Sequence, residues 1–182
     1  MKIIQFALDL NYVNVYLTFD EATKDAFLVD CGAFTDDIHG AIKSHGLQLR
    51  FLLLTHTHYD HINGISELKK SYPVPIYAAE SGYDHQVAEG DTIPFCDETM
   101  RVFETPGHTP DGVCYIIRDR VFVGDAIFSG AVGGTASREN FWQQNRAVWD
   151  KVLHLPGNTT IYPGHGAPST VEVERLYNPF FA

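Results

Sequence analysis

The sequence predicts an α/β sandwich, in which two mixed β-sheets pack face to face and helices flank them. Three observations support this prediction. Short apolar runs typical of strands alternate with amphipathic segments, in the order strands, helix, strands, helix. The 182 residues suit one domain with a sizeable core. The chain also contains no linker, low-complexity tract or internal repeat that would suggest a further division.

The first half of the chain is rich in β-type runs. Apolar and β-branched residues bounded by turn residues predict strands at 3–7, 14–19, 26–30, 51–54 and 75–79. Residues 20–24 are typical of a hairpin turn. A helix is expected from Thr35 or Asp36 to Ser44, with Asp36 as its cap and Gly46 as its stop. A second helix is expected over 62–71, ended by Pro73.

The second half repeats the alternation with different residues. Strands are expected at 100–104, 113–117, 120–123 and 159–162. One long helix is expected over 138–155, because residues recur there near helical spacing: Phe141, Asn145, Val148, Val152 and Leu155. One or two helical turns are expected over 171–177.

Composition excludes several classes of function. The net charge of −10, with no basic cluster larger than Lys69-Lys70, argues against nucleic-acid binding. No apolar run approaches the roughly 20 residues needed to cross a bilayer, and the N-terminus lacks signal-peptide features. We therefore expect a cytoplasmic protein that binds neither nucleic acid nor membrane. Cys31, Cys96 and Cys114 include no CxxC pair and are expected to be small buried residues in a reducing compartment.

The tract after the apolar run 51–54 is the densest group of ionisable residues in the chain. His56, His58, Asp60 and His61 fall within six positions. A buried imidazole or carboxylate must be paired or bound to a metal, because otherwise it destabilises the fold. Zinc and iron bind nitrogen and carboxylate oxygen. The tract therefore predicts half of a metal site.

Three later residues complete this site in our interpretation. His108, Asp125 and His165 each follow an expected strand and sit in a turn that contains glycine, with proline beside both histidines. Such turns change the chain direction sharply and fix where a side chain points. Each residue alone is a weak signal, but the three together with the histidine tract indicate one site.

Spacing suggests how the ligands divide. In an extended loop, residues two apart point the same way, so His56 and His58 can bind one ion together. Asp60 and His61 face another direction and suit a second ion. His108 would complete the first site, His165 the second, and Asp125 has two oxygens that could bridge them. The other histidines lie outside this scheme: His39, His45 and His154 are expected at the surface, and His85 is in a loop that could border a pocket.

These motifs resemble those of the metallo-β-lactamase superfamily. The resemblance rests on His56–His61, the turn 105–110, Gly124-Asp125 and Pro163–Gly166, and runs from about Val13 to the C-terminus. It implies an αββα sandwich with a metal site at one edge of the sheets. Within the superfamily, segments 105–112, 124–128 and 162–180 are similar to the glyoxalase II group, which hydrolyses S-acylglutathione thioesters.

The resemblance also implies roles and limits. It places His56, His58, His108 and Asp125 around one metal, and Asp60, His61, Asp125 and His165 around the other. Residues 1–182 are expected to form a single metallo-β-lactamase-like domain without a C-terminal glutathione-binding helical domain, because few residues follow Gly166. Gly134 also lies where that group commonly has a basic residue for the glutathione carboxylate.

The expected cofactors are two divalent metal ions, with Zn first and Fe or Mn as alternatives, because the ligands suit all three. A hydroxide on the metals would attack a small-molecule thioester or ester, and Asp60 would be the catalytic residue that holds it.

Two alternatives remain at this stage. His56, His108 and Asp125 alone would form the two-histidine, one-carboxylate set of a mononuclear Fe(II) enzyme, as in persulfide dioxygenases of the superfamily. The cluster could also be a structural zinc site, although such sites are usually closed and rich in cysteine. The sequence does not predict an oligomeric state.

Overall fold

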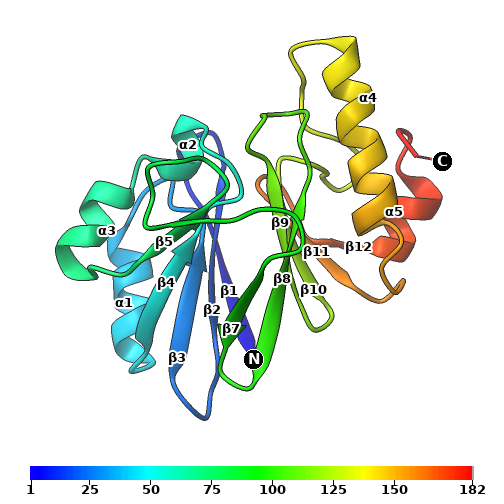
Figure 1. Cartoon of the computed structure of the whole chain (residues 1–182). Helices are drawn as coiled ribbons and strands as arrows, with labels where there is room; N and C mark the ends of the chain where they lie inside the picture. Colours follow the sequence, from blue (N-terminus) through cyan, green and yellow to red (C-terminus); the bar gives the residue numbers. More distant parts are fainter. Residues whose placement is uncertain (182) are drawn as a thin grey trace.

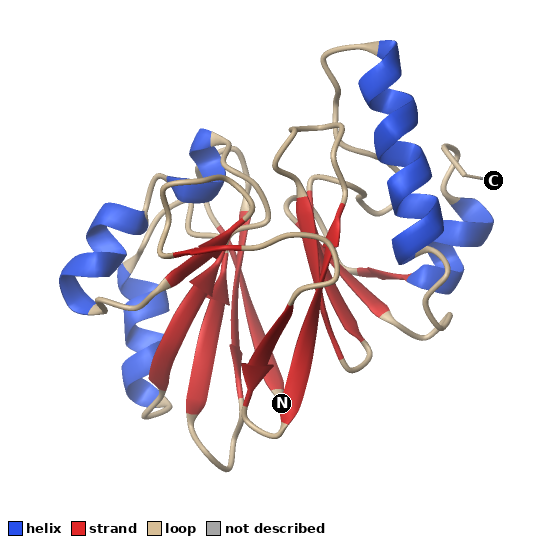
Figure 2. Cartoon of the chain, in the orientation of Figure 1, coloured by secondary structure: helices blue, strands red, loops and turns tan. Residues whose placement is uncertain are grey.

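Two six-stranded sheets form the centre of the molecule, and the helices lie on the outside (Figures 1 and 2). This arrangement is seen in a computed structural model that describes residues 1–181. The predicted α/β sandwich of two mixed sheets is therefore confirmed. Among residues 1–181, no helix combines the length and apolarity that crossing a membrane requires.

The first sheet is built from the first half of the chain, and its strands follow each other in chain order: β1 (Lys2–Ala7), β2 (Asn14–Phe19), β3 (Asp25–Val29), β4 (Gln48–Leu53), β5 (Ile76–Ala78) and β6 (His85–Gln86). The first three strands are antiparallel, and β3 to β6 run parallel. The associated helices are α1 (Asp36–Ser44), α2 (Tyr59–Ile62) and α3 (Ile65–Ser71).

The second sheet has the order β12 (Ser169–Thr170), β11 (Thr160–Pro163), β10 (Arg120–Gly124), β9 (Val113–Ile117), β8 (Glu98–Glu104) and β7 (Thr92–Phe95). Only β10 and β11 run parallel, and the other neighbours are antiparallel. The outer face carries α4 (Arg138–Ala147), a π-helical turn η1 (Val148–Val152) and α5 (Val171–Tyr177).

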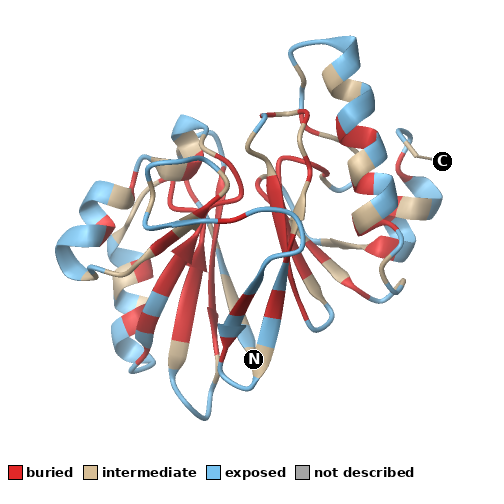
Figure 3. Cartoon of the chain, in the orientation of Figure 1, coloured by how far each residue is buried: buried red, intermediate tan, exposed pale blue. Residues whose placement is uncertain are grey.

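Three apolar layers hold the sandwich together. The middle layer joins the two sheets and is rich in aromatic rings, such as Phe27 of β3 and Phe95 of β7, which meet edge to face with centroids 4.8 Å apart. An outer layer joins the first sheet to α1 and α3, and another joins the second sheet to η1 and α5. Figure 3 shows the resulting pattern, with buried strands inside and exposed helix faces outside.

The predicted helix 62–71 is wrong at its start, because two helices occupy this region. α2 ends at Ile62, and α3 begins at Ile65. Between them the Gly64 N–H donates to the Cys31 carbonyl at 2.7 Å, and a Cβ at Gly64 would collide with the Ala33 backbone. This close approach interrupts the helical hydrogen bonds and turns Asp60 and His61 into a separate short helix.

The predicted helix 138–155 also differs from the structure. α4 ends at Ala147, and the chain continues as the π-turn η1, whose end is marked by a Leu153 N–H that donates to the Val148 carbonyl at 2.9 Å. The cap of α1 is likewise corrected, because the Thr35 hydroxyl rather than Asp36 accepts the Ile38 N–H.

Three short strands are absent from the sequence prediction: β6, β7 and β12. β7 contains Pro94, which cannot donate to a ladder, and it is tolerated because β7 is an edge strand paired with β8 alone. The cysteine prediction is correct for Cys31 and Cys114, which are buried, but wrong for Cys96, which is exposed. Cys96 lies in the turn between β7 and β8 with a left-handed φ of 55°.

Candidate metal centre

All seven predicted ligand residues come together in three overlapping groups, in each of which the ligand atoms lie within 4.8 Å of one another. They follow the ends of four strands: β4, β8, β10 and β11. Their side chains differ in exposure to solvent: that of His61 is fully buried, and that of His165 is 25% exposed. The cluster is therefore anchored in the protein interior and open to solvent on one side.

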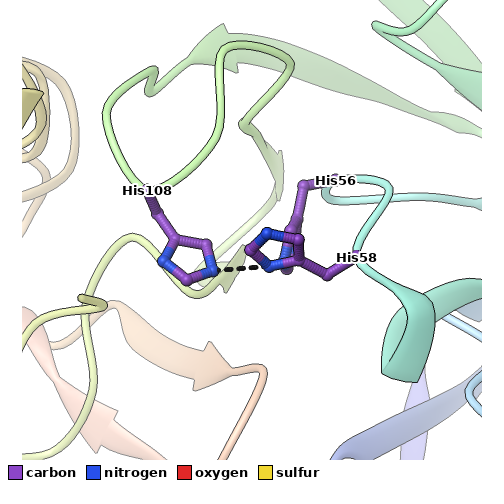
Figure 4. Close-up of side chains that lie close together, drawn as sticks. All are labelled: His56, His58 and His108. Carbon is purple, nitrogen blue, oxygen red and sulfur yellow. Dashed lines mark hydrogen bonds between the residues drawn. The ribbon is translucent and has the colours of Figure 1, made fainter. Parts of the chain in front are cut away.

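The first group consists of His56, His58 and His108. The Nδ1 of His58 lies 2.8 Å from His108 Nε2 and 3.1 Å from His56 Nε2, so three ring nitrogens converge (Figure 4). The other nitrogen of His108 is 2.6 Å from the Gly134 carbonyl, to which it must donate a proton. A neutral His108 therefore presents the lone pair of its Nε2 to the cluster, as a metal ligand does.

The second group consists of Asp60, His61 and His165. Their ligand atoms lie within 4.8 Å of one another, and His165 Nε2 is 3.6 Å from Asp60 Oδ2. His61 is turned toward this group by its other nitrogen, Nδ1, which is 2.8 Å from Asp30 Oδ2.

Asp125 lies between the two groups. Its Oδ2 is 3.4 Å from His108 Nε2 of the first group and 3.5 Å from His165 Nε2 of the second. Its Oδ1 is 3.4 Å from His61 Nε2. One carboxylate therefore faces both groups, which is the position expected of a bridging ligand.

Asp30 is a residue of this cluster that the sequence analysis missed. It is buried, and its carboxylate accepts hydrogen bonds from the Thr55 N–H, the Thr55 hydroxyl and His61 Nδ1, each at 2.8 Å. A carboxylate behind a metal-binding histidine fixes the tautomer and orientation of the ring. The signal was present in the sequence, because Asp30 follows the apolar run of β3 just as Asp125 follows β10.

The histidines of the cluster differ in the direction in which their pKa values are shifted. Burial lowers the pKa of His56 to about 4, so this ring is neutral at physiological pH. Burial also opposes the charged form of His61, but the carboxylates of Asp30 and Asp125 outweigh it and raise the His61 pKa to about 10. Asp125 is buried too, yet the neighbouring His165 and His61 hold its pKa well below the usual range.

The donor atoms fit divalent cations. Among residues 1–181, His61 Nε2 and Asp125 Oδ1 are buried and lack a hydrogen-bond partner, and they face one another. A buried polar atom without a partner is costly, and a bound cation would satisfy both. Imidazole nitrogens and carboxylate oxygens without thiolates suit Zn, Fe or Mn.

Gly164 is required by the packing around this cluster. A Cβ there would collide with Asp125 Oδ1 and press on the His61 ring. We expect Gly164→Ala to displace both side chains and to lower metal affinity at least about 10-fold, as loss of an orienting contact does. Metal titration of the purified variant checks this. Gly40→Ala in α1 is the control, because its Cβ meets nothing and metal affinity should not change.

A second prediction concerns the metal-free protein. The pKa of His61 is raised in the folded state, so the stability it contributes is fully present below about pH 6.5 and is lost as pH rises toward 10. Between pH 7 and 8.5 the free energy of unfolding should fall, by at most about 2 kcal/mol, since the folded state binds one extra proton. Urea unfolding with a chelator present measures this fall.

The pH range matters for that measurement. Burial raises the pKa values of the Cys31 and Cys114 thiols to about 12. At higher pH these thiols would therefore also lower the free energy of unfolding, in the same direction as His61. A His61→Gln variant should show a flatter profile between pH 7 and 8.5. An equally steep profile in this variant would refute the assignment to His61.

One family model and two curated relatives match this chain over much of its length. The model of the metallo-beta-lactamase superfamily matches residues 8–91. A hydroxyacylglutathione hydrolase of Hahella chejuensis is 36% identical over 149 residues, which are 78% of this chain and 57% of that protein. The persulfide dioxygenase ETHE1 of Mus musculus is 34% identical over 176 residues, which are 90% of this chain and 69% of that protein. The chain thus spans little more than half of the Hahella relative.

Solved structures agree on the fold. The B3 metallo-beta-lactamase BLEG-1 superposes with a TM-score of 0.91 at 25% identity, covering 100% of both chains. TTHA1623, solved in a di-iron-bound form, superposes with a TM-score of 0.79 at 25% identity, covering 97% of this chain and 99% of its own. The two mixed sheets and their flanking helices are therefore shared with proteins of this fold.

Proposed function

This chain belongs to the metallo-beta-lactamase superfamily, and from that membership we propose that it is a dinuclear metal-dependent hydrolase of thioesters or related esters, similar to glyoxalase II. The observation that carries the proposal is the position of Asp125, whose Oδ2 lies 3.4 Å from the first group and 3.5 Å from the second. A mononuclear site would need only one of these groups. The di-iron form of TTHA1623 supports the same assignment.

We assign the ligands from the geometry. His56, His58 and His108 would hold the first ion, Asp60, His61 and His165 the second, and Asp125 both. Divalent ions held there would supply an acidified water as nucleophile near neutral pH and a Lewis acid for the carbonyl oxygen of the substrate. Zn is our first choice, with Fe and Mn as alternatives.

The chain's own residues then orient the reaction. Asp60 is 14% exposed at the open side of the cluster, so its carboxylate can accept a hydrogen bond from the attacking water and align it. Asp30 keeps His61 in the tautomer that presents Nε2. A thiolate leaving group needs little acid assistance, and the mechanism therefore requires no further proton donor.

A second function is favoured by one specific observation, the similarity to the persulfide dioxygenase of Mus musculus. In that case His56, His108 and Asp125 would hold a single Fe(II), leaving open positions for oxygen and substrate. The second group would then have no catalytic ion. The two functions therefore differ in metal content as well as in substrate.

Elemental analysis of protein purified without added metal, followed by thioester, lactone and persulfide assays, tests the proposal. Two ions per chain and thioester or ester hydrolysis without oxygen uptake are expected. One iron per chain with persulfide-dependent oxygen uptake would overturn the hydrolase in favour of the dioxygenase. A structural site is tested by chelation, which should remove activity while the circular dichroism of the sandwich persists.

A further inference from the structure

We propose that Asn11 is a positioning residue for the second metal ion, because it fixes the carboxylate of Asp60. This inference rests on the proposed dinuclear function. The Asn11 side-chain amide donates from Nδ2 to Asp60 Oδ2 at 3.2 Å, across the space between the β1–β2 loop and α2. Within residues 1–181, no other side chain donates a hydrogen bond to this carboxylate.

The backbone around Asn11 forms a tight turn. Asn11 and Tyr12 both adopt left-handed conformations, with φ of 49° and 57°. Asparagine tolerates this region, but a bulky residue such as tyrosine adopts it at a cost of order 1–3 kcal/mol. Such strain persists only where surrounding contacts impose it. Here the Val13 N–H donates to the Leu10 carbonyl at 3.0 Å and closes the turn.

The end of the same loop also contacts His165, the other partly exposed residue of the second group. Val13 pairs with His165 in an isolated β-bridge, and the Asn14 N–H donates to the Gly164 carbonyl at 2.7 Å. The Asn14 side chain donates to the carbonyls of Pro163 and Gly166, each at 2.9 Å. The turn that carries His165 is thus held by Val13, the last residue of the β1–β2 loop, and by Asn14, the first residue of β2.

The first group has different supports. His108 is held by the Gly134 carbonyl and His56 by Thr55, and in the described part of the chain no hydrogen bond joins the β1–β2 loop to His56, His58 or His108. The loop therefore acts on the second ion selectively. A change at Asn11 should weaken the second ion and spare the first, which a general loss of stability would not do.

Asn11→Gly is the variant that isolates this role. Glycine adopts the left-handed conformation freely, so the substitution keeps the backbone and removes only the amide. Lys24→Gly is the matched control, because Lys24 is also left-handed, with φ of 65°, and lies in the β2–β3 turn. Both variants should change the melting temperature of the metal-free protein by similar small amounts, because glycine relieves the left-handed strain but adds freedom to the unfolded chain.

The experiment measures the binding of Zn²⁺ alone to metal-free protein by equilibrium dialysis. Wild type and Lys24→Gly should bind two ions. Asn11→Gly should bind the first ion with unchanged affinity and the second about 10- to 100-fold more weakly, as expected when an outer hydrogen bond to a ligand is lost.

Two results would overturn the inference alone: wild-type affinity for both ions in Asn11→Gly, or equal weakening of both. If the wild-type protein itself binds fewer than two ions, the proposed dinuclear function is contradicted, and the inference that rests on it is contradicted as well.

Discussion

Asp125→Ala is expected to abolish hydrolysis and to reduce the metal content of the purified protein. Among residues 1–181, Asp125 is the one carboxylate that faces both groups, with His108 Nε2 at 3.4 Å and His165 Nε2 at 3.5 Å from its Oδ2. Alanine would remove a ligand from each ion and leave His61, whose Nε2 lies 3.4 Å from Asp125 Oδ1, facing an empty space. We expect turnover to fall by at least ~1,000-fold, on the order of 4 kcal/mol in activation free energy.

Activity per chain and metal per chain should be measured on the same preparation. Asp97→Ala is the control, because Asp97 is a largely exposed aspartate in the β7–β8 turn whose side chain is 82% accessible. It should retain both metal and activity. Full activity in Asp125→Ala would show that this carboxylate does not bridge the ions.

The parts of the fold that sequence periodicity predicted are those in which local pattern and burial agree. β2 and β9 begin and end as expected, because every residue in them is buried between layers and apolar or β-branched residues dominate. α5 likewise matches the expected range, since Thr170 caps its first turn. The seven candidate ligands were proposed because four of them lie close together in the tract His56–His61, and this tract gave weight to the individually weak signals of His108, Asp125 and His165.

The parts that sequence could not predict depend on contacts between distant segments. The break at Gly64 is held by a hydrogen bond to the Cys31 carbonyl, more than thirty positions earlier, and the Asn63-Gly64 pair by itself does not reveal this contact. β7 is a strand only because β8 pairs with it, despite Pro94. Asn11 looks like an ordinary turn residue until the fold brings it to Asp60, whereas Asp30 could have been found from its place after the apolar run of β3.

Asp30 should be the most sensitive position outside the ligand set. Its buried carboxylate accepts three hydrogen bonds, two from Thr55 and one from His61 Nδ1. Asp30→Ala would leave these donors unpaired, and removing one member of a buried charged pair costs about 3–5 kcal/mol. We expect this loss in urea unfolding of the metal-free protein. Asp25→Ala is the control at the other end of β3, because its partner Arg50 is exposed and such surface pairs contribute about 1 kcal/mol or less.

Asp30→Asn separates the positioning role of this residue from its structural role. The amide keeps the shape of the carboxylate, so the loss of stability should be smaller than in Asp30→Ala. The Thr55 N–H, which needs an acceptor, favours the amide oxygen at the Oδ1 position and so the amide nitrogen in place of Oδ2. That nitrogen can only donate to His61 Nδ1, which forces the ring proton onto Nε2, the atom that must bind the metal. The second ion should therefore bind about 10- to 100-fold more weakly while the first is retained. Zinc titration of this variant measures the difference, and wild-type affinity for the second ion would show that Asp30 only supports the fold.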